Sequence, residues 1–247
     1  MTMTICIGTS GWSYQHWEGV LYPYQLAPRS RLDYYIQHYQ TVEVNSTYYR
    51  WPPDAAFTNW QRRLPQGFLM SIKAPRGLTH YQRLYSPENW LARISGGLKC
   101  LGDRLGILLV QLPPQFGCDL ARLAYFLEQL PPWIKAAIEF RHPSWHIDEV
   151  FSLLERFGVA YCVMSGAHLP CILRATAPFV YVRLHGPDRH FLYGGSYSDE
   201  DLSWWASRLC EWESQGRSTF VYFNNDGAGN AVRNASKLKT FLENGTC

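Results

Sequence analysis

Short apolar runs alternate along the whole chain with stretches of helical periodicity. Eight of these runs are rich in β-branched and aromatic residues, and most are apolar throughout, which is typical of strands buried on both faces. They predict strands at Ile5–Thr9, Val42–Thr47, Phe68–Lys73, Gly106–Gln111, Ala136–Arg141, Val159–Ser165, Phe179–His185 and Thr219–Asn224.

Between the strands, apolar residues recur three or four positions apart, which predicts amphipathic helices. Ser198, followed by three acidic residues, is typical of a helix N-cap and first turn. The clearest apolar face consists of Leu120, Leu123, Leu127 and Leu130.

The alternation predicts a parallel α/β fold, because parallel strands need crossover connections. Eight strands in a chain of 247 residues fit one closed eight-stranded barrel of the TIM type, a single domain spanning residues 1–247. One interval fits poorly: Gly166–Pro178 is short and holds two prolines. We therefore expect a degenerate connection between strands six and seven.

Composition narrows the class of protein. The net charge of +3 and the pI near 8.4 are below what a dedicated nucleic-acid module shows. Seven cysteines without a C-x-x-C pair indicate free thiols rather than a disulfide frame or a zinc site. The sequence shows neither a signal peptide nor a membrane-spanning run, so we expect a cytoplasmic protein without membrane contact.

Polar residues gather where the predicted strands end, the face that carries function in α/β barrels. Residues two apart on a strand share a face, so such pairs point the same way. The polar residues at these ends are Glu43, Asn45, Thr47, Ser71, Lys73, Gln111, Glu139, Arg141, Arg183, His185, Asn224, Asn225 and Asp226.

Three strong cations among them predict a site for a small anionic ligand, phosphorylated or sugar-like. Lys73, Arg141 and Arg183 would hold the anion, while Glu139 or His185 would serve as acid/base in any hydrolase, lyase or isomerase chemistry. A catalytic role for Lys73 is a further hypothesis. The remaining predicted ligand contacts are Trp12, Asn45, Thr47, Gln111, Asn225 and Asp226.

A glycine-containing turn after the last strand supports an anion, because glycine lets backbone N–H groups approach a ligand. The simpler interpretation of this turn is an ordinary helix start with Asp226 as the N-cap. The simpler interpretation of the cations is an internal ion-pair network in which Glu43 and Glu139 neutralise Lys73, Arg141 and Arg183.

Two other functions stay open. The first is a divalent-metal barrel, similar to sugar isomerases or abasic-site endonucleases, with Glu43, Glu139, His185 and Asp226 as ligands; the neighbouring cations disfavour it, and no cofactor is expected otherwise. The second is binding of single-stranded nucleic acid or a nucleotide by aromatic residues around the mouth of the barrel.

Several motifs together resemble one family across the whole chain. They are Ile7–Tyr14, Val42–Arg50, Lys73–Arg76 followed by Thr79 and His80, Val110–Pro114, Ile138–Trp145, Tyr181–Gly186 and Tyr222–Asp226. In this order they resemble the YecE-like family, domain of unknown function 72. The resemblance implies the barrel fold and supplies no reaction.

Overall fold

The computed structural model describes residues 5–246. Two compact units make up the chain: the first comprises residues 5–42, 163–173 and 178–246, and the second comprises 43–162 and 174–177. The strands are β1 (Ile5–Thr9), β2 (Thr41–Val44), β3 (Leu69–Lys73), β4 (Leu105–Gln111), β5 (Ala136–Glu139), β6 (Ala160–Ser165), β7 (Phe179–Leu184) and β8 (Ser218–Phe223).

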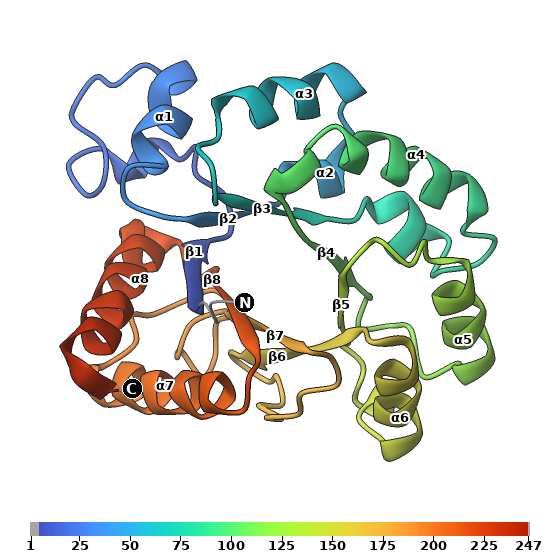
Figure 1. The fold of residues 1–247 in the computed structure, drawn as a ribbon. Helices are drawn as coiled ribbons and strands as arrows, with labels where there is room; N and C mark the ends of the chain where they lie inside the picture. Colours follow the sequence, from blue (N-terminus) through green and yellow to red (C-terminus); the bar gives the residue numbers. More distant parts are fainter. Residues whose placement is uncertain (1–4, 247) are drawn as a thin grey trace. The chain divides into compact units, whose positions relative to one another are not determined.

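The strands follow the order β1-β8-β7-β6-β5-β4-β3-β2 (Figure 1). The pairings of β1 with β8, β7 with β8, β3 with β4, β4 with β5 and β5 with β6 are parallel. The order is that of an eight-stranded parallel α/β barrel, nearly closed, as predicted. The single domain expected for residues 1–247 stays a prediction.

Most strand bounds match the prediction within one or two residues, but the second does not. β2 ends at Val44, and Ser46–Tyr49 forms the short helix α2 instead of the predicted strand end. The Thr47 hydroxyl lies 2.9 Å from the Val44 carbonyl oxygen and 2.7 Å from that of Lys73. Local bonding of this kind favours a turn over a continued strand.

In the first unit, α7 (Asp199–Ser214) and α8 (Asn230–Phe241) pack against each other and against β8 (Figure 1). The predicted cap at Ser198 is confirmed: its hydroxyl accepts from the Asp201 N–H, and the Asp201 carboxylate accepts from the Ser198 N–H. Two short 3-10 helices, η1 (Gln15–Trp17) and η2 (Pro28–Ser30), and α1 (Arg31–Tyr35) follow β1.

The start of β2 approaches β1 within the first unit through one tyrosine. The Tyr35 hydroxyl accepts from the Thr9 N–H at 3.0 Å and donates to the Thr41 carbonyl at 3.1 Å. It thus bridges backbone groups that a regular ladder would join directly. A Cβ added to Gly8 would lie 2.2 Å from the same Thr41 carbonyl oxygen, so only glycine fits there.

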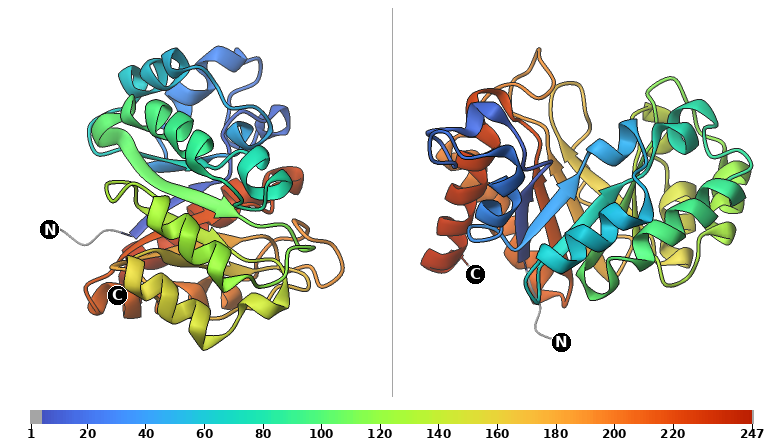
Figure 2. Two further views of the ribbon diagram at one scale, coloured as in Figure 1. Left: turned by 90° about the vertical axis from the view of Figure 1, so that its right-hand side faces the viewer. Right: turned by 90° about the horizontal axis from the view of Figure 1, so that it is seen from above.

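In the second unit, α3 (Asp54–Arg63) and α4 (Glu88–Lys99) run side by side (Figure 2). The π-helical turn η3 (Gly77–Tyr81) precedes α4, and α5 (Leu120–Gln129) and α6 (Asp148–Phe157) follow. Of the predicted leucine face, Leu123 and Leu127 are buried and Leu120 is exposed. Apolar residues of β3, β4 and β5 fill the core of this unit.

The degenerate connection is also confirmed, since residues 166–178 contain neither helix nor strand. Among the described residues, no helix is both long and apolar enough to cross a membrane; the cytoplasmic location stays a prediction. Cys6, Cys100, Cys118, Cys162 and Cys171 are free thiols. Cys210 is disulfide-bonded, so the expectation of a free thiol is wrong there.

Candidate functional site

The carboxylate of Glu139, at the end of β5, organises a polar cluster in the second unit. Glu139 is fully buried. One carboxylate oxygen accepts from Gln111 Nε2 at 2.7 Å and from Arg141 Nε, and the Cys162 thiol lies 3.9 Å from the other. A buried carboxylate needs such partners to remain ionised. These contacts bring Gln111, Glu139 and Arg141 together, as the sequence predicted.

Lys73, at the end of β3, lies on an aromatic ring supplied by α2. Its Nζ stands 4.5 Å from the centre of the Tyr48 ring, a cation–π contact. The imidazole of His80 meets the same ring edge-on, with ring centres 5.0 Å apart. Tyr48 therefore joins a strand-end lysine to a histidine that belongs to η3.

The hydrogen bonds of His80 define which ring nitrogen can take a proton. The Thr79 hydroxyl donates to the Pro75 carbonyl at 3.2 Å and lies 2.9 Å from His80 Nδ1. With the single hydroxyl proton directed at the Pro75 carbonyl, Nδ1–H donates to the hydroxyl and the lone pair of the neutral ring is on Nε2. Nε2 is thus the atom that could act as a base.

Burial lowers the pKa of His80 to about 4, and the positive charges of Lys73 and Arg141 add to this effect. The negative charge of Glu139 acts in the opposite direction and is the smallest of these influences. The surroundings of the imidazole are therefore positive on balance, even though one carboxylate is present. His80 is neutral near pH 7.

Asn45 and Thr47 flank this cluster at the start of α2. The Thr47 hydroxyl is occupied by the backbone contacts given above, so its observed contacts are structural. Asn45 differs, because its side-chain oxygen is buried and has no hydrogen-bond partner among the described residues. It is an acceptor suited to a ligand hydroxyl.

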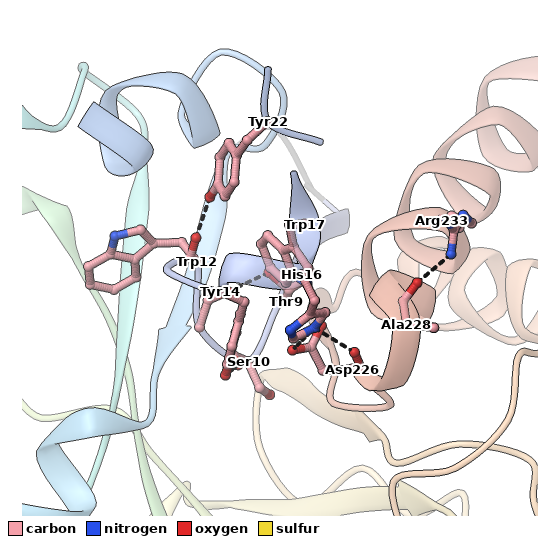
Figure 3. Close-up of polar contacts among 11 residues, drawn as sticks. Thr9, Ser10, Trp12, Tyr14, His16, Trp17, Tyr22, Asp226, Ala228 and Arg233 are labelled. Carbon is pink, nitrogen blue, oxygen red and sulfur yellow. Dashed lines mark hydrogen bonds and ion pairs between the residues drawn. The ribbon is translucent and has the colours of Figure 1, made fainter. Parts of the chain in front are cut away.

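Asp226, after β8 in the first unit, is held by the segment that follows β1 (Figure 3). Trp17 Nε1 donates to one carboxylate oxygen at 2.6 Å, and His16 Nε2 lies 3.0 Å from the other. Burial raises the pKa of Asp226, while these two contacts oppose the shift. Asp226 stands at the N-cap position of the 3-10 turn that follows, but its side chain makes no cap hydrogen bond there.

The glycine-containing turn after Asp226 forms a 3-10 turn, η6 (Gly227–Gly229), before α8. Arg233 of α8 donates to the Ala228 carbonyl at 2.6 Å and so ties the turn to the helix (Figure 3). In the same view the Trp12 ring points away from the pair formed by His16 and Asp226. The hydrogen bond observed at this turn is therefore made to α8, within the same unit.

Three other predicted residues of the first unit are buried. Arg183 and His185 are fully buried, and the His185 ring meets that of Tyr193 edge-on. Asn225 Nδ2 donates to the Gly195 carbonyl at 3.0 Å and to Asn234 at 2.8 Å. Asn225 thereby anchors the segment that precedes α7.

The structure thus groups Lys73, Gln111, Glu139 and Arg141 in one unit, and places Trp12, Arg183, His185, Asn225 and Asp226 in the other. Their predicted roles in catalysis and ligand binding stay predictions. Among the described residues, no group of three or more His, Cys, Asp or Glu could hold a metal ion. The alternative ligands Glu43, Glu139, His185 and Asp226 therefore gain no support from the geometry.

Sequence reasoning missed Tyr48 and His80 as site residues. Neither lies on a strand, so the pattern of polar strand ends could not find them. The only signal was their position beside strand-end motifs, in the segments that begin at Val42 and Lys73.

The family model described as "Protein of unknown function DUF72" matches residues 6–246. The chain belongs to the DUF72 family. Among related DUF72 structures, a crystal structure from Thermotoga maritima has a TM-score of 0.87 and 30% identity, covering 97% of this chain and 99% of that one. This similarity supports the eight-stranded parallel barrel.

Two proteins of known sequence are also similar to this chain. The UPF0759 protein YunF of Bacillus subtilis is 27% identical over 270 residues, covering 97% of this chain and 95% of YunF. The UPF0759 protein YecE of Escherichia coli K12 is 29% identical over 142 residues, covering 57% of this chain and 50% of YecE. These names state no ligand and no reaction for this DUF72 protein.

Proposed function

We propose that the second unit binds a small anionic ligand, phosphorylated or sugar-like, beside Lys73 and Arg141. The observation that supports this most is the placement of both cations around a neutral histidine whose surroundings remain positive despite Glu139. An anion entering there would gain Coulomb energy in a partly desolvated site.

The contacts within the cluster also suggest a different role for each side chain. Glu139 contacts the Arg141 guanidinium through Nε, and a guanidinium is the group whose planar charge suits phosphate or carboxylate. We therefore assign to Glu139 the positioning of Arg141 and Gln111. Asn45 would accept from a ligand hydroxyl, which favours a phosphorylated sugar over a bare anion.

If the bound ligand reacts, we assign the acid/base role to His80 Nε2. The imidazole is neutral near pH 7 and can accept a proton from a ligand hydroxyl or C–H group. Glu139 is less suited because its charge already serves Arg141 and Gln111. A histidine base accords with hydrolase, lyase or isomerase chemistry and selects none of them.

Ligand-dependent stability tests the proposal. Inorganic phosphate, a phosphosugar or a nucleoside monophosphate at about 100 times its Kd should stabilise the folded protein by about 2.7 kcal/mol. For a chain of this size, Tm should rise by about 5–10 °C in a melting experiment. Lys73→Gln should weaken binding about tenfold or more, because one charge-assisted hydrogen bond is lost.

Lys99→Gln is the matched control, since Lys99 is an exposed lysine of the same unit. It should respond to each anion as the unaltered protein does. The proposal fails if no anion changes Tm, or if both lysine variants lose the response equally.

Anion binding should also take up protons. A bound anion beside His80 favours the imidazolium form, so the pKa of His80 should rise from about 4 when the ligand is present. Affinity should then increase as the pH falls from about 7 toward about 5. Titration calorimetry with sulfate, which does not titrate in this range, in buffers of different ionisation enthalpy measures the uptake.

His80→Gln should bind sulfate without this proton uptake. Equal uptake by the variant and the unaltered protein would show that another group titrates, and would remove His80 from the site.

A further inference from the structure

A second surface of the second unit combines arginine with exposed aromatic rings. It is a groove of about 620 Å³ between α2, η3 and α4. Its lining contains three arginines, five aromatic residues and no carboxylate. The lining residues are Tyr48, Tyr49, Arg50, Trp51, Pro53, Pro75, Arg76, Gly77, Tyr81, Trp90 and Arg93; we call it the arginine–aromatic groove.

The arginines of this groove make no ion pair among the described residues. Two of them lie over aromatic rings of the same groove: Arg76 is 5.5 Å from the centre of the Tyr81 ring, and Arg93 is 5.7 Å from that of Trp90. The third, Arg50, is exposed. Three positive charges without a carboxylate partner form a surface complementary to an anion.

The groove lies in a strongly basic segment. Residues 46–99 contain eight basic and two acidic residues, a net charge of +6, whereas the rest of the chain contains fifteen basic and eighteen acidic residues, a net charge of −3. The small net charge of the whole chain therefore conceals a local excess of positive charge. This excess of positive charge lies in the part of the chain that forms the groove.

Two of the aromatic rings are placed to stack on a ligand rather than to fill a core. The side chains of Tyr49 and Tyr81 are 68% and 70% exposed. Trp90 packs so closely on the backbone of η3 that a Cβ added to Gly77 would lie 2.2 Å from its ring. Trp51 is 5% exposed, and its indole N–H has no acceptor among the described residues.

We propose that the arginine–aromatic groove binds single-stranded nucleic acid, with phosphates on Arg50, Arg76 and Arg93 and unpaired bases stacked on the exposed rings. The proposal does not rest on the anion site at Lys73, although Tyr48 belongs to both. It goes beyond that site because its ligand is a polymer.

The combination of features selects this partner. A duplex offers phosphates but keeps its bases stacked inside, where the tyrosine rings cannot reach them. An acidic peptide would use the arginines and leave the rings in water. An unpaired strand uses both, because every base has a flat face for stacking and every nucleotide has a phosphate. Binding to anionic vesicles is the alternative that the experiment below must exclude.

Fluorescence anisotropy with a labelled single strand of about ten nucleotides tests the proposal. The affinity should fall with salt: log Kd should rise by about 2 for each unit increase in the logarithm of the salt concentration, as three neutralised phosphates require. A duplex of the same sequence should bind at least about tenfold more weakly. Replacing Arg50, Arg76 and Arg93 together by Gln should abolish most of the salt dependence and weaken binding about tenfold or more.

The matched control replaces Arg62, Arg83 and Arg156 by Gln, three exposed arginines outside the groove. It removes the same charge and should change the affinity about twofold at most. A second variant, Tyr49→Ser with Tyr81→Ser, should weaken binding about fivefold and leave the salt slope unchanged. Both tyrosines are exposed, so the fold does not depend on them.

Four results would overturn the proposal: no binding at low salt, equal affinity for the duplex, equal losses in the groove and control variants, or equally tight arginine-dependent binding of polyglutamate or phosphatidylserine vesicles. The response to sulfate separates the two proposals. If the unaltered protein binds the strand while sulfate does not change its Tm, the groove proposal stands and the anion site at Lys73 fails.

Discussion

Glu139→Ala should lower the free energy of unfolding by about 3–5 kcal/mol, because it leaves the charge of Arg141 buried without its partner. The Arg141 side chain is 8% exposed and that of Glu139 is fully buried. Gln111 would also lose the acceptor for its amide. Urea unfolding monitored by tryptophan fluorescence measures the difference.

Glu155→Ala is the matched control in the same unit. Glu155 pairs with Arg174 at 2.9 Å, but both side chains are more than 40% exposed. An exposed pair contributes about 1 kcal/mol or less. If the two alanine variants lose equal stability, burial is not what makes the Glu139 pair important, and its assigned positioning role loses its basis.

Gly8→Ala should cost about 3 kcal/mol, because the added methyl group would meet a backbone oxygen that cannot move independently. The new Cβ would lie 2.2 Å from the Thr41 carbonyl oxygen and 3.0 Å from its carbon. That oxygen also accepts from Tyr35, so relieving the clash disturbs the bridge between β1 and β2. Thermal and urea unfolding should both show the loss.

Gly227→Ala is the control for the glycine change itself. A Cβ added there has no neighbour within 4 Å, and the backbone needs no left-handed conformation. Its stability should stay within about 0.5 kcal/mol of the unaltered protein. A Gly8→Ala variant as stable as Gly227→Ala would contradict the close approach of the two strands.

The fold could be predicted because parallel strands buried on both faces leave an unmistakable pattern. Continuous apolar runs such as that of β4 cannot face water on either side, and their alternation with helices permits few topologies. The error at β2 arose where a polar side chain bonds locally: the Thr47 hydroxyl donates to the Val44 carbonyl at the start of α2, and hydrophobic periodicity carries no information on such bonding.

The candidate site was predictable only where it lies on strands. Gln111, Glu139 and Arg141 follow from strand ends that meet at one edge, which sequence position determines. The roles of Tyr48 and His80 depend on how α2 and η3 pack on that edge. The groove was harder still to predict from the sequence. Arg50, Arg76 and Arg93 are far apart along the chain, and the net charge of +3 for the whole chain does not reveal a local cluster of positive charge.

Concentrating basic residues between 46 and 99 has a practical consequence for handling the protein. A cation-exchange resin interacts with the most basic patch and not with the average charge. Retention should therefore exceed what a pI near 8.4 indicates, and copurifying polyanions should be removed by high-salt washing before ligands are assigned.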